Sequence, residues 1–311
     1  MAMATARISG EMKILLLGAN GQVGMECRRR LAGMGDFVCA TRDGRLSDGG
    51  SCEQADFDDP HSLRTLVLRV KPDVVVNAAA YTAVDKAETE RAAAFRANTE
   101  APAEIALACK ELGAYLIHYS TDYVFDGQGS RPYLPDDATA PLGIYGESKL
   151  AGEEAIRASG CEYAILRTSW VYASHGKNFL QTMLRLGKDR DELRVVADQI
   201  GTPTPAALIA DVTARIVAAQ DRPSRTWHLT PHGQTSWQGF AEAIMEGAHR
   251  RGLLAKRPVV TAITTAEFPT PASRPAWSVL DNGSLEHDWQ LTLPTWQAGL
   301  DAVLDELIPA A

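Results

Sequence analysis

Two side chains near the middle of the sequence form a pair that can carry out proton transfer. Tyr145 and Lys149 are four residues apart in YGESK, so on a helix they lie on the same face. A free tyrosine has a pKa of about 10, and a neighbouring ammonium group stabilises the phenolate and lowers that value. The spacing therefore favours Tyr145 as a general acid assisted by Lys149. A YxxxK string is common by chance, and an exposed helix face is the alternative interpretation.

A hydroxyl group is predicted beside this pair. Ser120-Thr121-Asp122 stands at the end of an apolar stretch, and α/β folds place ligand-binding residues at the ends of parallel strands. Thr121 can hydrogen-bond a carbonyl oxygen alongside Tyr145, so a developing alkoxide would have two donors and a nearby cation. With a nicotinamide, this combination suits hydride transfer to or from a carbonyl, and it does not suit hydrolysis.

A glycine-rich turn predicts a dinucleotide site. The strand predicted at Lys13–Leu17 leads directly into GANGQVG (18–24), with the spacing GxxGxxG, and a helix is predicted over Gln22–Ala32. Glycines permit a tight turn and close backbone approach, so amides at the helix N-terminus can bind a pyrophosphate. The small side chains of Asn77-Ala78-Ala79-Ala80 leave room for the same cofactor. The alternatives are a turn without a ligand and alanines that serve packing.

The end of the second predicted strand, Phe37–Thr41, bears on the choice of cofactor. An acidic residue here binds the ribose 2′-hydroxyl of NAD, whereas an arginine accommodates the 2′-phosphate of NADP. Thr41 stands in place of an acid and Arg42 follows it, which favours NADPH, while Asp43 leaves the use of NADH open. Further on, Asp56-Phe57 is a candidate for the edge and face of the adenine.

Alternating strand-like and helical segments must position these residues, which is typical of βαβ units and a parallel sheet. Further strands are predicted at Asp73–Asn77, Ala114–Ser120 and Tyr163–Thr168, and helices at Pro60–Val70 with Asp59 as N-cap, Ala87–Leu112 and Tyr145–Ser159. The predicted fold class is α/β, a Rossmann-type doubly wound parallel sheet with a smaller C-terminal substrate-binding lobe.

From Trp170 onward this alternation fades, and proline-rich connections appear at Thr202–Pro205 and Phe268–Pro275. We expect residues 1–11 to form a disordered extension and residues 12–170 to form the dinucleotide-binding domain, to which later segments return. Residues 171–311 are expected to form mainly the substrate-binding lobe, which closes over a ligand.

Composition excludes several classes of function. Of the 311 residues 45% are hydrophobic and 23% charged, as in globular proteins, and with a net charge of −8 and no basic run we expect no nucleic-acid or membrane partner. The early apolar run Ile14 to Leu17 is too short to span a bilayer. Five scattered cysteines without a CxxC pair favour reduced thiols in a cytoplasmic protein over disulfides or a zinc site.

Longer strings carry a specific resemblance that runs through most of the chain. They are GANGQVG (18–24), PDVVVNAAAYTAVDKAE (72–88), HYSTDYVFDG (118–127), APLGIYGESKLAGE (140–153), RTSWVY (167–172), NFLQTMLRL (178–186) and TPASRP (270–275). The sequence resembles the dTDP-4-dehydrorhamnose reductase family of extended short-chain dehydrogenases/reductases. The resemblance implies reduction of the C4 ketone of dTDP-4-dehydro-β-L-rhamnose by NADPH, the preferred cofactor, or NADH, as the final step of dTDP-L-rhamnose synthesis.

The resemblance also implies roles for individual residues. The catalytic set would be Thr121, Tyr145 and Lys149. Cofactor contacts would be Gly21, Gln22, Val23, Asp56, Phe57, Ala80, Tyr81, Thr82 and Tyr119, and Gly18, Gly24, Thr41, Arg42, Ala78, Tyr145 and Lys149 complete the predicted cofactor site. The sugar-nucleotide site would be Val84, Thr121, Asp122, Tyr123, Trp170 and Arg274.

Three of these substrate residues have a physical rationale of their own. Trp170 and Tyr123 have flat side chains that pack well on the apolar face of a 6-deoxysugar, with core aromatics as the alternative. Arg274 stands between prolines and can pair with a diphosphate, with a solvated surface charge as the alternative.

One departure from the family concerns metal. In members where magnesium joins two subunits the ligands are acidic, and one of those positions is Ala207 here. Glu26 and Asp211 do not complete a ligand set, because a divalent ion needs several oxygen ligands. We therefore predict no metal site, and a monomer or weak homodimer.

Two other functions stay open. One is an epimerase or dehydratase that acts on another sugar nucleotide and retains bound NAD. The other is a non-catalytic regulatory subunit, because the family resembles the β subunit of methionine adenosyltransferase. An intact Thr121, Tyr145 and Lys149 favour an enzyme.

Overall fold

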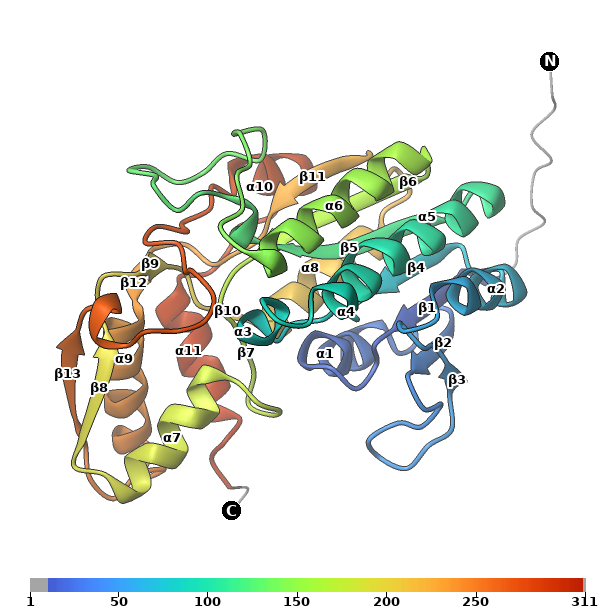
Figure 1. The fold of residues 1–311 in the computed structure, drawn as a ribbon. Coiled ribbons are helices and arrows are strands. Elements are labelled where there is room, and N and C mark those ends of the chain that lie inside the picture. Colours follow the sequence, from blue (N-terminus) through green and yellow to red (C-terminus); the bar gives the residue numbers. More distant parts are fainter. Residues whose placement is uncertain (1–10, 310–311) are drawn as a thin grey trace.

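A parallel β-sheet forms the centre of the computed structural model, which describes residues 11–309 (Figure 1). Within these residues the sheet has seven strands in the order β11-β6-β5-β4-β1-β2-β3. They are β1 (Lys13–Leu17), β2 (Asp36–Thr41), β3 (Glu53–Gln54), β4 (Val74–Asn77), β5 (Tyr115–Thr121), β6 (Glu162–Thr168) and β11 (Arg225–His228). All neighbours pair in parallel. The strand order reverses at β1 and β4, which is where doubly wound sheets bind their ligands.

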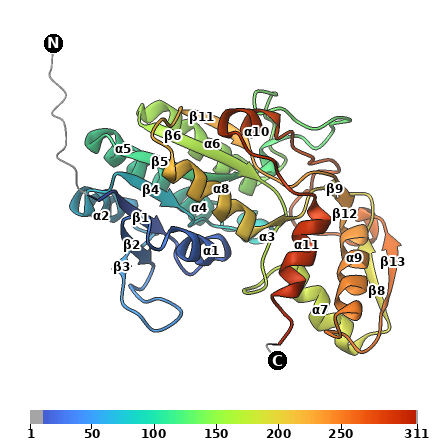
Figure 2. The ribbon, with the colours of Figure 1, turned by 180° about the vertical axis from the view of Figure 1, so that it is seen from behind.

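Helices cover both faces of this sheet, as Figures 1 and 2 show from opposite sides. Ile14 and Leu16 of β1 belong to a core shared with one helical layer, and Leu15 and Leu17 belong to the core of the other. The first layer contains α1 (Gln22–Leu31), α8 (Ala206–Ala218) and α10 (Gly283–Trp289), and the second contains α2 (Pro60–Val70), α5 (Ala101–Leu112) and α6 (Ile144–Ser159). Burial on both faces explains why β1 is a continuous apolar run rather than an alternating one.

Most of the predicted elements are confirmed. The strand at Lys13–Leu17 and the helix at Pro60–Val70 have the predicted bounds, and the Asp59 side chain accepts a hydrogen bond from the backbone N–H of Ser62 as the N-cap. The other predicted elements differ from the structure by one residue at one end, or at both ends for the strand predicted at Ala114–Ser120, apart from the long helix predicted at Ala87–Leu112.

That long helix is wrong as predicted. The chain forms α3 (Val84–Ala87), a break at residues 88–90, α4 (Arg91–Phe95), a π-helical turn at Arg96–Glu100 and then α5. Pro102 has no N–H to donate to the carbonyl of Asn98, and a Cβ on Gly152 of α6 would lie 2.0 Å from that carbonyl oxygen. The Asn98 side chain bonds to the main chain of Tyr81. Tertiary contacts therefore widen the turn.

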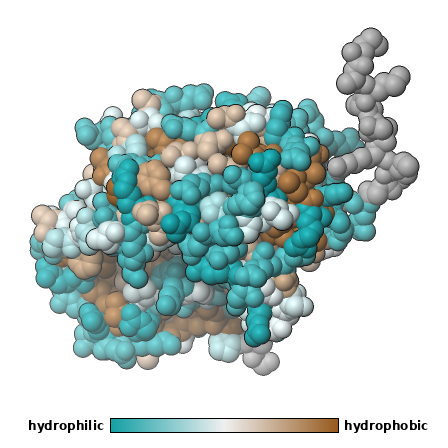
Figure 3. Space-filling view, turned by 45° about the vertical axis from the view of Figure 1, so that its right-hand side comes forward, coloured by the Kyte–Doolittle hydropathy of each residue, from teal (hydrophilic) through white to brown (hydrophobic). Residues whose placement is uncertain are grey.

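A second lobe is built from segments that alternate in sequence with α8, β11 and α10, and it has a core of its own, which includes Leu180, Phe240 and Leu300. Its elements are α7 (Phe179–Asp189), β8 (Glu192–Val196), α9 (Trp237–Arg250), β13 (Val259–Ile263) and α11 (Trp296–Asp305). Short strands connect it to the rest: β7 (Val171–Tyr172), β9 (Ile200–Gly201), β10 (Thr204–Pro205) and β12 (Thr235–Ser236). In Figure 3 most of the visible surface is hydrophilic, and hydrophobic residues gather in a recess in its lower half.

Some predictions concern the whole chain. The extension predicted for residues 1–11 lies, except for Glu11, outside the described residues. All five cysteines are free thiols. No helix within residues 11–309 is long and apolar enough to cross a membrane.

Candidate active site

A cavity of about 830 Å³ opens at the carboxyl ends of β1, β4 and β5, where the strand order reverses. Trp170, Val171 and Lys177, which follow β6, complete its wall. The structure brings together on this wall the predicted residues Gly18, Gly21, Gln22, Val23, Thr41, Arg42, Phe57, Ala78, Ala80, Tyr81, Thr82, Val84, Tyr119, Thr121, Asp122, Tyr123, Tyr145, Lys149 and Trp170. The volume suits a ligand larger than a simple metabolite.

Three predicted residues do not line this cavity. Gly24 lies within α1, where a Cβ would come 2.0 Å from the carbonyl oxygen of Gly18, so glycine is needed here for close packing. The Asp56 carboxylate accepts the backbone N–H of Asp58 at 3.0 Å. Arg274 binds the carboxylate of Asp85.

The glycine loop forms a cradle that side chains would fill. Gly18 has a φ of +80°, and a Cβ there would lie 2.7 Å from the backbone nitrogen of Ala79. Gly21 is the N-cap of α1, which has no side-chain cap and no acidic residue in its first turn. The amides and the positive end of the helix dipole at this N-terminus fit the pyrophosphate of a dinucleotide.

The end of β2 is organised by Thr41. Its hydroxyl lies 3.1 Å from a carboxylate oxygen of Asp43 and accepts the backbone N–H of Arg45 at 3.0 Å. The same N–H, followed by the Thr41 hydroxyl, holds the pKa of Asp43 below its usual value. Arg42 lines the cavity and makes no ion pair with any residue between 11 and 309. A free guanidinium beside an engaged carboxylate fits a phosphate better than a hydroxyl at this end of the cavity.

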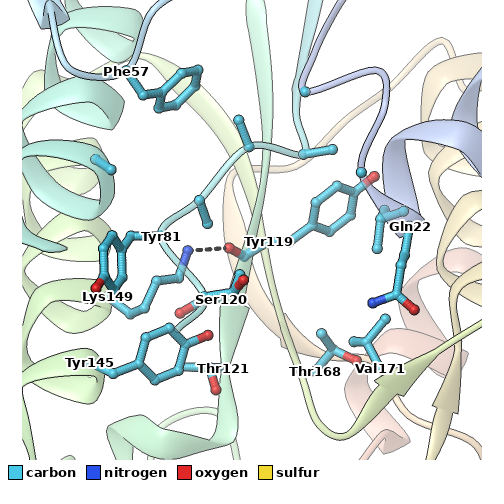
Figure 4. A pocket seen from close by; sticks show the side chains of 18 of the residues that line it. Gln22, Phe57, Tyr81, Tyr119, Ser120, Thr121, Tyr145, Lys149, Thr168 and Val171 are labelled. Atoms are coloured by element: carbon cyan, nitrogen blue, oxygen red, sulfur yellow. Dashed lines mark hydrogen bonds between the residues drawn. The ribbon is translucent and has the colours of Figure 1, made fainter. Parts of the chain in front are cut away.

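The three predicted catalytic residues share one wall of the cavity (Figure 4). Thr121 ends β5, and Tyr145 lies in the first turn of α6 with Lys149 one turn later. The ring of Tyr145 packs edge-on against Tyr123, with centroids 5.4 Å apart. The side-chain nitrogen of Lys149, Nζ, donates a hydrogen bond to the main-chain oxygen of Tyr119 at 2.7 Å.

Burial decides the protonation of this pair. It raises the pKa of Tyr145 to about 12, although a hydrogen bond with Thr121 acts in the opposite direction. It lowers the pKa of Lys149 to about 8, against the attraction of Glu153. The expectation that Lys149 lowers the pKa of Tyr145 is therefore wrong for this structure, because burial raises that pKa and the nearby charge of Asp122 raises it further. Tyr145 keeps its proton at neutral pH, as a general acid must.

The backbone of Trp170 is strained where it borders the cavity. Its φ is +48°, a conformation that costs free energy for any residue other than glycine. The indole is stacked on Trp237, with ring centroids 3.7 Å apart. This stacking holds a flat apolar surface at the cavity wall.

The sequence prediction missed some wall residues. They include Asn20, Ala55, Asp58, Ala97, Thr168, Ser169, Val171 and Lys177. Thr168 ends β6 and Ser169 follows it, so both are signalled by the rule that ligands bind at strand ends. Lys177 has no such signal, because tertiary hydrogen bonds place it: Asn178 Nδ2 donates to Gln22 Oε1 at 2.8 Å, and Nε2 of His175 lies 2.7 Å from Oε1 of Glu26.

The acidic residues considered for metal binding are engaged elsewhere. Glu26 is buried and paired with Arg29 and His175, and Asp211 is paired with Arg30. Ala207 lies in the first turn of α8. In the part of the chain that the structure describes, no group of three His, Cys, Asp or Glu side chains is placed to hold a metal ion.

Comparison with known proteins decides the family. The family model described as RmlD substrate binding domain matches residues 12–308. A dTDP-4-dehydrorhamnose reductase of Shigella flexneri is 46% identical over 299 residues, which are 95% of this chain and 98% of that protein. The chain belongs to the dTDP-4-dehydrorhamnose reductase family. The predicted resemblance is confirmed.

Solved structures of the family confirm the predicted fold class. The crystal structure of a dTDP-4-dehydrorhamnose reductase from Bacillus anthracis in complex with NADP has a TM-score of 0.86 and 33% identity, and covers 96% of this chain and all of that one. A Clostridium acetobutylicum structure of the same name has a TM-score of 0.85 and 38% identity, covering 95% and 99%.

Proposed function

We propose that this protein reduces the C4 ketone of dTDP-4-dehydro-β-L-rhamnose to dTDP-β-L-rhamnose, with NADPH as the preferred reductant and NADH as the alternative. This reaction is the final step of dTDP-L-rhamnose biosynthesis. The observation that carries the proposal is that Thr121, Tyr145 and Lys149 lie together on one wall of the cavity at the strand-order reversal, and that the glycine loop lines the same cavity. The name of the Shigella flexneri relative supports the choice of substrate.

The cofactor would lie along the cavity from the end of β2 to Lys149. The amides of Gly21 and the start of α1 would hold its pyrophosphate, with the ammonium of Lys177 beside them. Arg42 would meet the 2′-phosphate. The NADP in the Bacillus anthracis structure supports this choice. When bound, the nicotinamide supplies the hydride.

Each catalytic side chain would have one task. Tyr145 would donate its phenolic proton to the carbonyl oxygen as that oxygen gains charge. In this structure the Thr121 hydroxyl donates to a carboxylate oxygen of Asp122 at 2.9 Å. With substrate bound, the same hydroxyl would donate to the substrate carbonyl oxygen instead. Lys149, anchored on the carbonyl of Tyr119, would bind the nicotinamide ribose and place a positive charge behind the phenol.

The rest of the substrate would occupy the side of the cavity toward the second lobe. Trp170 and Tyr123 would pack on the apolar face of the sugar, next to Val84. Arg274 would bind the diphosphate after exchanging its present partner, Asp85.

We further propose a cytoplasmic monomer or weak homodimer that works without a metal bridge. The five free cysteines support the compartment, and the ion pairs of Glu26 and Asp211 support an assembly without metal ligands. Size-exclusion chromatography with and without EDTA tests the assembly: an unchanged elution volume is expected, and a dimer that dissociates in EDTA would contradict it.

A spectrophotometric assay tests the reaction. Purified protein should oxidise NADPH, and more slowly NADH, only when the dehydrorhamnose substrate is present, and EDTA should not abolish the rate. Protein purified with NAD already bound, and a sugar product without net loss of reduced cofactor, would instead indicate an epimerase or dehydratase. No turnover by folded, cofactor-binding protein would indicate a binding subunit.

A further inference from the structure

A buried chain of hydrogen bonds connects the cavity wall with Lys149. The backbone N–H of Ala79 donates to Oδ1 of Asn77 at 3.2 Å, and Nδ2 of Asn77 lies 3.1 Å from Nδ1 of His118. Nε2 of His118 lies 3.3 Å from Nζ of Lys149, which donates to the carbonyl of Tyr119. The side chains of Asn77, His118 and Lys149 are almost fully buried, so the contacts among them lie out of reach of bulk water.

The main-chain N–H of Ala79 determines which groups donate and which accept along this series of hydrogen bonds. An amide N–H can only donate, so Ala79 holds the oxygen of the Asn77 amide and the amide nitrogen faces His118. That nitrogen donates to Nδ1, and a neutral imidazole then carries its proton on Nε2. Burial keeps the pKa of His118 well below its usual value, so the ring is neutral. The Nε2–H therefore points at Lys149.

This direction requires an unprotonated amine, because an ammonium group has three donors and no acceptor. When Lys149 takes a proton from solvent, Nε2 must become the acceptor and the His118 proton must move to Nδ1. The amide of Asn77 must then turn its oxygen to Nδ1, and the N–H of Ala79 loses its partner. Net uptake is one proton, and the residue that changes partner, Ala79, lines the cavity beside Gly18.

We propose that Asn77 and His118 are positioning residues that link the charge on Lys149 to the wall of the cofactor cavity, through a hydrogen-bond chain that runs in opposite directions in the two charge states. With a neutral amine the chain runs as in this structure. With an ammonium it is reversed, and the N–H of Ala79 is free for an acceptor in the cavity. The proposal rests on the proposed function only in that Lys149 assists the reacting phenol.

The other groups around Lys149 leave both states accessible. Glu153, one turn along α6, raises its pKa, but that carboxylate is bound by Arg167 at 2.7 Å and by Arg157 at 2.6 Å. Other titratable side chains that line the cavity near Lys149 and Tyr145 include Tyr81, Tyr119, Asp122 and Tyr123. Burial lowers the pKa of Lys149 to about 8, so a modest change in pH reverses the direction of the hydrogen-bond chain.

Nitrogen NMR of the His118 ring in the full-length wild-type protein tests the chain without any assay of activity. The imidazole nitrogen shifts report which nitrogen carries the proton. We expect the Nε2–H form above the titration of Lys149 and the Nδ1–H form below it, with a midpoint near pH 8. One tautomer at every pH, or a doubly protonated ring, would overturn the proposal.

The variant Asn77→Asp tests the same chain through the reaction. A carboxylate only accepts, so it can bind the N–H of Ala79 and an Nδ1–H of His118 together, which favours the reversed direction and the ammonium form of Lys149. The alkaline limb of kcat/KM should move to higher pH by roughly one unit, a tenfold change in proton affinity. An unmoved limb in a folded variant would contradict the proposal.

A second variant, His118→Phe, separates a direct electrostatic effect of the new carboxylate from an effect that passes through the His118 ring. In His118→Phe the ring keeps its bulk but loses both nitrogens, so adding Asn77→Asp should no longer move the limb. The same shift in both backgrounds would mean that the charge acts through space, and it would overturn the role of His118. If the protein proves inactive on the keto-sugar but the tautomer changes as expected, the proposed function fails and the hydrogen-bond chain stands.

Discussion

Arg274 binds Asp85 through both outer nitrogens of its guanidinium group, at 3.0 and 2.9 Å from the two carboxylate oxygens. Asp85 is in α3 next to Val84, which lines the cavity, and the two partners are 189 positions apart in the chain. The guanidinium is only partly exposed. The group predicted to bind a diphosphate is therefore already paired, and a substrate must compete with Asp85 for it.

Substitution of the two partners should have opposite effects. Arg274→Met should raise KM for the sugar nucleotide roughly ten- to a hundredfold, since a charge-assisted contact is lost, with little change in NADPH binding. Asp85→Asn keeps the shape but removes the competing charge, so it should tighten binding of dTDP. Calorimetric titration measures the affinity of both variants for dTDP, and steady-state kinetics measures KM for the sugar nucleotide. If Asp85→Asn weakens dTDP as much as Arg274→Met does, Asp85 supports the site rather than competing for it.

Loss of the Tyr145 hydroxyl should separate chemistry from binding. Tyr145→Phe retains the ring that packs on Tyr123, so NADPH affinity should stay within about twofold while kcat falls by a factor of roughly 10² to 10⁴, the usual span for a positioned acid. Single-turnover kinetics and fluorescence titration measure the two effects. Tyr123→Phe is the matched control on the neighbouring ring. Near-normal turnover by Tyr145→Phe would remove Tyr145 from its role.

The pH profile should be set by Lys149 rather than by Tyr145. The pKa of Lys149 is lowered to about 8, so its charge is present below that pH and is lost above it, whereas Tyr145, raised to about 12, stays protonated throughout. kcat/KM, which reports the free enzyme, should therefore fall above about pH 8. The variant Lys149→Met should be slower than the wild type, and its kcat/KM should not fall above about pH 8. A profile that is flat to pH 10, or one that rises with pH, would contradict this assignment.

Lys177 should contribute to cofactor binding from outside the glycine loop. It is exposed, lines the cavity and forms no ion pair within residues 11–309, so Lys177→Met should weaken NADPH and NADH equally, by roughly twofold to fivefold, because both carry the pyrophosphate. The loss should shrink at high salt. Lys188→Met, at the far end of α7, removes the same charge away from the cavity. A loss confined to NADPH would place Lys177 at the 2′-phosphate instead.

The parts of the fold and site that the sequence predicts are those determined by local patterns. β1 is recognisable because burial on both faces makes it continuously apolar, and α2 because Asp59 and Pro60 mark its start. Tyr145 and Lys149 share a face because a helix repeats every 3.6 residues. These signals need no knowledge of distant contacts.

Several of the missed features depend on tertiary contacts. The turn around Asn98 is widened by neighbours in α6, and Lys177 is placed by hydrogen bonds between distant segments. The direction of the Tyr145 pKa shift depends on how deeply the phenol is buried, which its spacing from Lys149 does not report. The sequence also gives no sign that Arg274 forms an ion pair with Asp85.

The fate of the transferred hydrogen tests the proposed reduction most directly. Wild-type protein would be given dTDP-4-dehydro-β-L-rhamnose and NADPH that carries deuterium at the transferable position of nicotinamide C4. We expect dTDP-β-L-rhamnose with one deuterium on C4 of the sugar and one equivalent of NADP formed per product, detected by mass spectrometry and NMR. A product with no label at C4, or a changed sugar without net oxidation of the cofactor, would contradict it.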